Sequence, residues 1–281
     1  MTRVKIGIAR ILYHFLRIFL KKDRHQVRRK GVCYEVDLSE GIDLSLFLFG
    51  NFQNYVTQSK YFSINADAII FDIGANIGSM TFRYAQAAPN GHVFAFEPTD
   101  YAFKKLNVNL SLNAKLAQRI TPIQLFLSDR SCSDHQIEAY ASWKIDGSAQ
   151  NPHPLHGGSM KTAGAVPAVT LDDFCKENGI QHIDLIKIDT DGHELQVLKG
   201  AQNSIKIFRP YVIFEIGLYV MQEQEIEFEQ FYSYFTNFGY NLLNAKNGKI
   251  ITLQNFSAQI PWRSTTDIIA RPPSNLYFPG K

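Results

Sequence analysis

Cysteine is scarce in this chain, which holds only Cys33, Cys132 and Cys175 among 281 residues. Their odd number gives no complete disulfide framework, and their spacing matches no metal-ligand pattern. An excess of one charge is also lacking, since 29 Lys and Arg face 26 Asp and Glu. The composition therefore favours a globular protein of a reducing, cytoplasmic compartment, and a net charge of +3 gives no indication of a nucleic-acid partner.

Long apolar runs are absent as well. The most apolar segment, residues 4–20, is interrupted by Arg10, His14 and Arg17 and ends without a small-residue cleavage site. These features argue against a membrane-spanning helix and against a signal peptide. The basic residues recur at helical spacing opposite apolar ones, which predicts an amphipathic helix. Packing of its apolar stripe on the domain or on a partner subunit is the favoured interpretation, and peripheral contact of residues 1–22 with the inner face of an anionic membrane is the alternative.

The hydrophobic pattern changes near residue 66. Residues 1–65 are predicted to form an N-terminal cap with the basic helix and a short strand at 30–38. Over residues 66–281, short apolar strands alternate with helical stretches, which predicts a doubly wound α/β domain with a mostly parallel sheet. The predicted strands are residues 68–73, 92–96, 123–127, 184–188 and 211–216, followed by a hairpin of 240–243 with 249–253 and a final strand at 267–270. The polar residues 131–167 are predicted to be an insertion that borders the acceptor pocket.

One strand runs directly into a glycine-containing turn. Residues 69–78 read Ile-Ile-Phe-Asp-Ile-Gly-Ala-Asn-Ile-Gly, and helical spacing follows. At such a turn Gly74 and Gly78 would let a ligand approach the backbone, with Asn76 between them. The spacing lacks the third glycine of a dinucleotide fingerprint, and Asp72 would repel a diphosphate but suit an ammonium or sulfonium group. The turn therefore favours S-adenosylmethionine over NAD as the cofactor.

Acidic and polar residues follow the next two predicted strands. Glu97, 19 residues beyond Gly78, stands at a strand tip from which a carboxylate can bind both hydroxyls of a ribose. Ser128 and Asp129 follow the third predicted strand, where a polar side chain could meet the adenine edge. A turn-capping role would explain these last two residues equally well.

These segments resemble the FkbM family of methyltransferases. The resemblance rests on residues 71–78, on Glu97-Pro98, on Leu171-Asp172 and on residues 186–201, and it covers roughly residues 66 to 216. It implies a seven-stranded, Rossmann-like methyltransferase sheet and methyl transfer to a hydroxyl of a sugar or polyketide-type acceptor. Many members carry Asp-x-Glu-Gly after the fourth strand, whereas this chain has Asp-Thr-Asp-Gly at 189–192.

The loop after the fourth strand supplies the candidate catalytic groups. A hydroxyl must lose its proton to attack a methyl group, and Asp189, Asp191 or His193 could serve as the base. We rank Asp189 first because it ends the strand, and His193 second because an imidazole titrates near neutral pH. Lys187 points to the same side as Asp189 and could orient its carboxylate or a substrate oxygen. A divalent cation on Asp189 and Asp191 is a less favoured alternative.

Two more acidic residues stand near the predicted site, and three other functions can be compared with methyl transfer. Glu215 could line the acceptor pocket, and Glu194 is expected to be an exposed residue that opens the next helix. A nucleotide-binding oxidoreductase lacks its fingerprint, and no Asn-Pro-Pro-aromatic motif for methylation of a flipped base occurs. A catalytically silent cofactor-binding or scaffold domain, recruited to a membrane or a partner, is the main alternative. The acceptor's identity and the oligomeric state are left open by the sequence.

Overall fold

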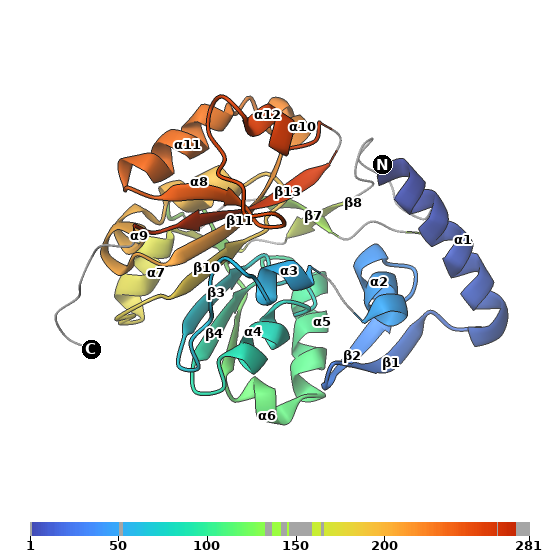
Figure 1. The fold of residues 1–281 in the computed structure, drawn as a ribbon. Coiled ribbons are helices and arrows are strands. Elements are labelled where there is room, and N and C mark those ends of the chain that lie inside the picture. Colours follow the sequence, from blue (N-terminus) through green and yellow to red (C-terminus); the bar gives the residue numbers. More distant parts are fainter. Residues whose placement is uncertain are drawn as a thin grey trace.

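The centre of the computed structural model is a seven-stranded, mostly parallel sheet (Figure 1). The structure describes residues 2–50, 53–132, 137–141, 145, 159–163, 166–262 and 264–273. The strand order is β12-β13-β11-β10-β3-β4-β5, and among these strands β13 alone runs antiparallel to the other six. The strands are β3 (Ile69–Ile73), β4 (His92–Phe96), β5 (Ile120–Ile123), β10 (Leu185–Ile188), β11 (Tyr211–Gly217), β12 (Asn241–Asn244) and β13 (Thr265–Arg271). The doubly wound α/β fold expected from the sequence is confirmed.

Helices cover both faces of this sheet, because its central strands are buried on both sides. One face carries α4 (Thr81–Ala87), α5 (Asp100–Ser111) and α6 (Ala114–Ala117). The other carries α7 (Leu171–Glu177), α8 (Glu194–Lys199), α9 (Gln202–Phe208) and α11 (Phe228–Asn237), with the short α10 (Leu218–Glu223) and α12 (Phe256–Gln259) nearby. Side chains alternate along β3, so that Ile70 packs in one core, and Phe71 and Ile73 pack in the other.

The N-terminal segment packs against the first of these faces. It contains α1 (Thr2–Leu20), β1 (Arg24–Arg29), β2 (Val32–Asp37), α2 (Gly41–Phe49) and α3 (Asn54–Thr57). The sequence predicts only the second arm of the β1–β2 hairpin, because β1 is polar and offers no apolar alternation. Asn113, which caps the start of α6, and Asn109 on α5 accept hydrogen bonds from the backbone N–H groups of Cys33 and Glu35, at 2.9 and 2.7 Å. These bonds tie β2 to the domain that follows it.

Two predicted strand regions differ from the structure. The third strand is Ile120–Ile123 rather than 123–127, and β6 (Phe126–Leu127) instead pairs with β9 (Ala168–Val169) outside the large sheet. Within the segment predicted as an insertion, β7 (Ile137–Ala141) and β8 (Ser159–Ala163) pair antiparallel. The expected hairpin partner at 249–253 is reduced to one bridge between Leu243 and Ile250. Short apolar runs fix neither the ends of a strand nor its partner.

Candidate active site

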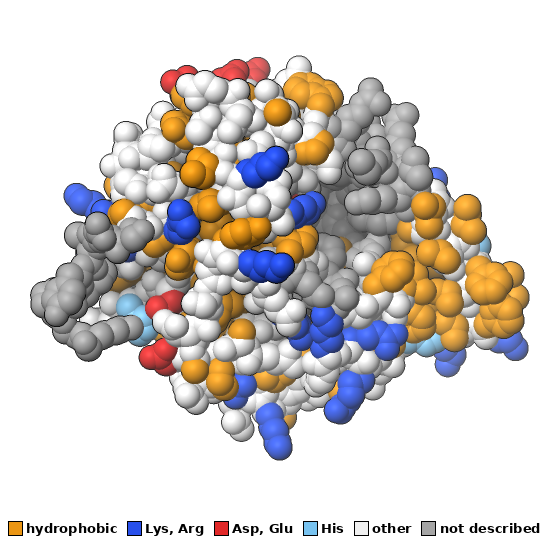
Figure 2. Space-filling model, in the orientation of Figure 1, with side chains coloured by type: hydrophobic (Ala, Val, Ile, Leu, Met, Phe, Trp, Pro, Cys, Tyr) orange, Lys and Arg blue, Asp and Glu red, His pale blue; other side chains and the backbone are white. Residues whose placement is uncertain are grey.

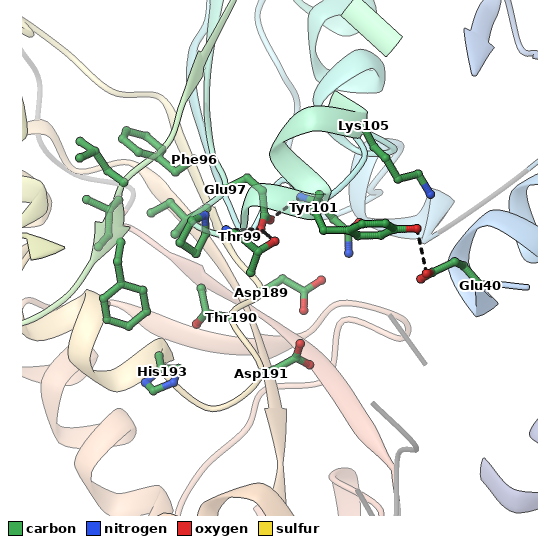
Figure 3. Close-up of a pocket in the computed structure, with 18 residues that line it drawn as sticks. Glu40, Phe96, Glu97, Thr99, Tyr101, Lys105, Asp189, Thr190, Asp191 and His193 are labelled. Atoms are coloured by element: carbon green, nitrogen blue, oxygen red, sulfur yellow. Dashed lines mark hydrogen bonds between the residues drawn. The ribbon is translucent and has the colours of Figure 1, made fainter. Parts of the chain in front are cut away.

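A pocket opens at the carboxyl ends of β3, β4 and β10, where connecting loops diverge (Figure 3). The space between its walls amounts to about 740 Å³, and part of this space is open solvent. Its walls combine an apolar side with a polar one. The lining residues are Glu40, Ile73, Gly74, Asn76, Phe96, Glu97, Pro98, Thr99, Tyr101, Ala102, Lys105, Leu125, Phe126, Leu127, Asp189, Thr190, Asp191 and His193.

The turn after β3 is shaped by the protein's own packing. At Gly74, with φ +82°, a Cβ would lie 1.8 Å from the carbonyl oxygen of Asp189. At Gly78, with φ +90°, a Cβ would meet side-chain atoms of Leu106 and Phe82 at 2.8 and 2.9 Å. The sequence argument assigned both glycines to ligand approach. Gly74 and Asn76 do line the pocket, but Gly78 is outside the described lining, and its small size is required by the helix packing.

Glu97 is buried at the tip of β4 and borders the pocket. Its Oε1 accepts hydrogen bonds from N and Oγ1 of Thr99 at 3.0 and 2.5 Å, and Oε2 accepts one from the backbone N–H of Asn76 at 2.9 Å. Burial raises the pKa of Glu97, while these three hydrogen bonds oppose the increase. The contacts fix the carboxylate and leave Oε2 with capacity for a further donor.

Asp72 is placed inside the sheet rather than in the pocket. It pairs in register with Lys187 on β10, so both side chains point to the α4 side. Asp72 Oδ2 accepts a 2.6 Å hydrogen bond from Thr81, and Oδ1 lies 3.9 Å from Lys187 Nζ. Burial raises the pKa of Asp72, whereas the charge of Lys187 and the bond from Thr81 oppose this. Asp72 is fully buried and outside the described lining, so the structure gives no support for direct cofactor contact.

Lys187 joins this buried carboxylate to the pocket. Its Nζ donates a 2.9 Å hydrogen bond to Oδ2 of Asp189, whose side chain is 21% exposed. Burial lowers the pKa of Lys187, but the charges of Asp189 and Asp72 outweigh burial and raise it above its ordinary value. The ammonium group therefore stays charged and orients Asp189.

Glu194 holds the loop that carries the candidate bases. Its Oε1 accepts hydrogen bonds from N and Oγ1 of Thr190 at 2.9 and 3.1 Å, and Oε2 accepts one from the backbone N–H of Gly192 at 3.1 Å. The expectation that Glu194 is exposed is wrong, because its residue surface is only 6% accessible. The hydrogen bonds from Thr190 and Gly192 to Glu194 span Asp191, which has φ +52°. From its position in the sequence, Glu194 could not be distinguished from an ordinary acidic residue in the first turn of a helix.

Asp189, Asp191 and His193 all reach the pocket from this loop, across from Glu97 and Thr99 (Figure 3). The His193 ring packs edge-on against Phe126, with ring centroids 5.3 Å apart. Surrounding protein atoms, and then the charges of Asp189 and Glu194, raise the pKa of Asp191 to about 8. Its side chain is exposed at the pocket mouth, so solvent moderates the increase.

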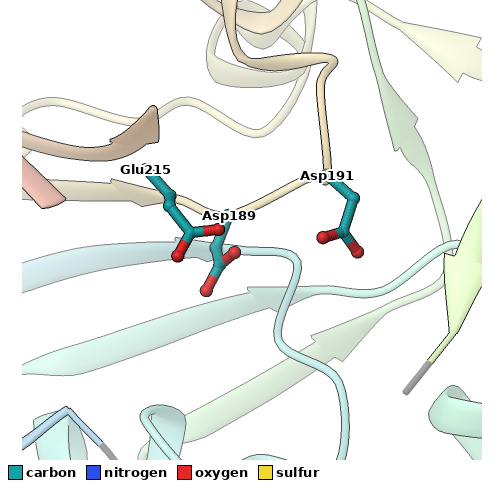
Figure 4. A group of neighbouring side chains, drawn as sticks. All are labelled: Asp189, Asp191 and Glu215. Carbon is teal, nitrogen blue, oxygen red and sulfur yellow. The ribbon is translucent and has the colours of Figure 1, made fainter. Parts of the chain in front are cut away.

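Glu215 on β11 adds a third carboxylate beside this loop (Figure 4). One oxygen from each of Asp189, Asp191 and Glu215 lies within 4.8 Å of the others. Thr265 donates a 2.6 Å hydrogen bond to Glu215, and burial, followed by the charge of Asp189, raises the pKa of Glu215 well above its ordinary value. Oxygen ligands of this kind could hold a divalent cation, but the ion pair with Lys187 already compensates Asp189.

Ser128 and Asp129 are predicted to meet the adenine edge, and the structure places both outside the described lining of the pocket. The described lining of the pocket includes Leu125, Phe126 and Leu127 but neither of these two residues. The backbone N–H of Ser128 donates to the carbonyl of Val169 at 3.0 Å, and its side chain bonds to Asp129 at 3.3 Å. The third strand ends at Ile123, and the residues of this segment that line the described pocket are therefore the apolar ones before Ser128.

The mouth of the pocket contains residues that the sequence did not indicate. Tyr101, on the first turn of α5, donates a 3.0 Å hydrogen bond to Glu40 of the N-terminal segment. Lys105, one turn further on, pairs with Asp43. These contacts join residues about 60 positions apart in the chain, so no local pattern could reveal them.

The strand order and the pocket at the carboxyl ends of the parallel strands define a Rossmann-like domain of the methyltransferase type. The chain belongs to the FkbM methyltransferase family, since the family described as Methyltransferase FkbM domain matches residues 72–242.

Two curated relatives cover the same region. The 2-O-methyltransferase NoeI of Sinorhizobium fredii is 30% identical over 151 residues, which are 50% of this chain and 59% of that protein. The hexuronic acid methyltransferase AglP of Haloferax volcanii is 26% identical over 155 residues, or 53% of this chain and 56% of that protein. The chain thus spans little more than half the length of these relatives.

A solved structure shares the fold. The crystal structure of methyltransferase FkbM from Methylobacillus flagellatus superposes with a TM-score of 0.50 at 17% identity. The superposition covers 77% of this chain and 47% of that one. At this identity the likeness concerns the fold alone.

Proposed function

We propose that this protein transfers a methyl group from S-adenosylmethionine to an oxygen of a sugar-containing acceptor. The observation that carries the proposal is the pocket itself. It places the fixed carboxylate of Glu97 opposite a loop with three candidate bases, Asp189, Asp191 and His193. Family membership supports the same reaction class.

The pocket residues fit the proposed cofactor in their chemistry. Glu97 Oε2 can accept a hydrogen bond from a ribose hydroxyl. Phe96, Leu125 and Leu127 form an apolar wall against which the adenine ring could pack. Gly74 and Asn76 border the same space. The bound cofactor supplies an activated methyl group, so the protein has to bind, orient the acceptor and remove a proton.

Asp189 is our first candidate for the general base. Its carboxylate lines the pocket, and Lys187 fixes its orientation through the 2.9 Å hydrogen bond. The pKa of Asp191 is raised, although solvent at its exposed side chain moderates the increase, so its carboxylate is less readily available near neutral pH than that of Asp189. His193 is the second candidate, because imidazole is suited to proton transfer near neutral pH. A divalent cation on Asp189 and Asp191 remains the less favoured alternative, and chelation by EDTA is expected to leave methyl transfer unchanged.

The acceptor class is inferred from the relatives. One is named a 2-O-methyltransferase and the other a hexuronic acid methyltransferase. A uronic acid offers both hydroxyl and carboxylate oxygens, and the bases in this pocket favour a hydroxyl, because only a hydroxyl must lose a proton. A methyl ether resists mild alkali, whereas a methyl ester is hydrolysed by it, so the product distinguishes the two.

Isothermal titration of the full chain tests the cofactor first, with S-adenosylmethionine and S-adenosylhomocysteine as ligands and NAD as the control. We expect binding of the first two and none of NAD. Incubation with methyl-labelled cofactor and glycans that contain uronic acid then tests transfer. If the folded protein binds neither S-adenosylmethionine nor S-adenosylhomocysteine, the proposal is contradicted and a scaffold role is favoured. Binding without transfer to any sugar would overturn the acceptor class.

A further inference from the structure

Helix α1 packs only part of its surface on the rest of the protein. The buried Tyr13 and the partly buried Ala9, Leu16 and Leu20 belong to the hydrophobic core beneath the helix. Tyr13 also donates a 3.0 Å hydrogen bond to Asp23, just after the helix. These contacts fix which face of α1 turns inward.

A second apolar stripe on the same helix faces solvent. Its members are Ile8, Ile11, Phe15, Ile18 and Phe19, each between 53 and 70% exposed. They recur at intervals of three and four residues and so form one continuous stripe. The Phe15 and Phe19 rings contact each other, with centroids 5.1 Å apart. Figure 2 shows hydrophobic side chains gathered where Figure 1 draws α1, with Lys and Arg side chains beside them.

The charge around this stripe has one sign. Arg10, Lys21 and Lys22 are exposed at or just after the helix, and residues 1–22 contain no Asp or Glu. The first acid, Asp23, forms an ion pair with Arg17 at 3.1 Å. By helical spacing, Arg10 falls on a sector between the inward face and the exposed stripe, while Lys21 and Lys22 directly follow the end of the helix at Leu20. An apolar stripe flanked by cations is complementary to an anionic lipid surface.

We propose that the exposed face of α1 docks on an anionic phospholipid bilayer, with the stripe in the interface and the basic residues on the headgroups. Among the described residues no helix is long and apolar enough to cross a membrane, so the contact we propose is peripheral. A second copy of the chain is the less favoured occupant, because pairing two stripes would bring the basic residues of both copies together. This surface is separate from the proposed methyl transfer and does not depend on it.

Flotation of the full chain with lipid vesicles tests the proposal, using phosphatidylcholine alone and phosphatidylcholine mixed with phosphatidylglycerol. We expect binding to the mixed vesicles, weakened by high salt. The double variant Phe15→Ser/Ile18→Ser should lower the vesicle partition constant at least about tenfold, because it removes two apolar side chains that would be buried in the bilayer interface. Lys21→Gln/Lys22→Gln should lower it by about fivefold for each charge that lies near the surface.

The matched control variants change exposed residues that lie outside α1. Ile207→Ser removes a 62% exposed apolar side chain from α9, and Lys199→Gln/Lys206→Gln removes two exposed charges. Both control variants should bind vesicles as the wild type does, and thermal unfolding should show all variants folded. No binding to mixed vesicles, or equal binding by the Phe15/Ile18 variant, would overturn the proposal. A dimer seen by size-exclusion chromatography with light scattering, lost in that variant, together with no vesicle binding, would assign the stripe to a second copy.

Discussion

The carbonyl oxygen of Asp189 occupies the space where a side chain at Gly74 would begin. A Cβ on Gly74 would lie 1.8 Å from that oxygen and 2.8 Å from the carbonyl carbon. The backbone N–H of Asp189 also donates to the carbonyl of Ile73 at 3.0 Å. The turn after β3 and the loop after β10 are therefore in direct backbone contact, and Gly74 and Asp189 both line the pocket.

Replacing Gly74 by Ala should be strongly destabilising, because neither backbone can move without disturbing a central strand. Gly179→Ala is the matched control, since it has φ +62° with no atom within 4 Å of the added Cβ. We expect a cost of roughly 1 kcal/mol in the unfolding free energy at Gly179 from backbone strain alone. At Gly74 the cost should exceed about 3 kcal/mol. Urea unfolding measures both, and equal costs would show that the close contact is unimportant.

Lys187→Met should lower the free energy of unfolding, because it removes the cation that lies between the carboxylates of Asp72 and Asp189. Asp72 is fully buried and Asp189 accepts directly from Lys187. Removing one member of a buried ion pair costs about 3 to 5 kcal/mol of unfolding free energy. Lys199→Met, at an exposed site on α8, should change stability by less than about 0.5 kcal/mol. Recovery of part of the loss by adding Asp189→Asn to Lys187→Met would identify the unpaired charge as the cause.

Glu97→Gln should weaken S-adenosylmethionine binding while the protein stays folded. The amide keeps the side-chain shape but replaces one charged acceptor oxygen with a donor, next to the N–H groups of Thr99 and Asn76. Loss of a charge-assisted hydrogen bond corresponds to a rise in Kd of roughly 10- to 100-fold. Titration calorimetry measures the change, with exposed Glu177→Gln as the control. An unchanged Kd in Glu97→Gln would remove Glu97 from the cofactor site.

Asp191→Asn should alter how stability depends on pH. The pKa of Asp191 is raised to about 8 from an ordinary value of 3.8, so the folded state binds its proton more tightly than the unfolded state. The corresponding stability is fully present below the ordinary pKa and is lost as pH rises through 8. The variant should therefore be more stable than the wild type above this range, by less than about 1 kcal/mol because the side chain is exposed.

Urea unfolding at acidic and alkaline pH gives the comparison for Asp191. Asp67→Asn, an exposed change at the opposite end of β3, serves as the control and should leave the pH dependence as it is. A stability difference between Asp191→Asn and wild type that does not vary with pH would show that Asp191 titrates as it does in the unfolded chain.

The sequence determined the sheet and the family to which it belongs. Strands β3, β4, β10 and β11 are short apolar runs bounded by polar residues, and burial on both faces leaves such a pattern in any parallel sheet. The motifs at residues 71–78, at Glu97 and at 186–201 likewise lie within single turns or strand ends. The conformation of a turn or a strand end depends mainly on the residues within it, so these motifs can be found from the local sequence.

Tertiary structure alone decided which polar residues meet the pocket. Asp72 lies in β3 and Glu97 directly follows β4, and register and side-chain direction bury Asp72 beside Lys187 but leave Glu97 at the pocket wall. Ser128 follows β6, which pairs outside the large sheet, and lies outside the described pocket lining, whereas Tyr101 and Glu40 meet across a long separation in sequence. The same holds for α1: its amphipathic pattern is local, but only packing shows that one apolar side is covered and the other is exposed. Whether a residue is buried and what it contacts depend on which helices and strands pack side by side, and local sequence patterns do not determine that packing.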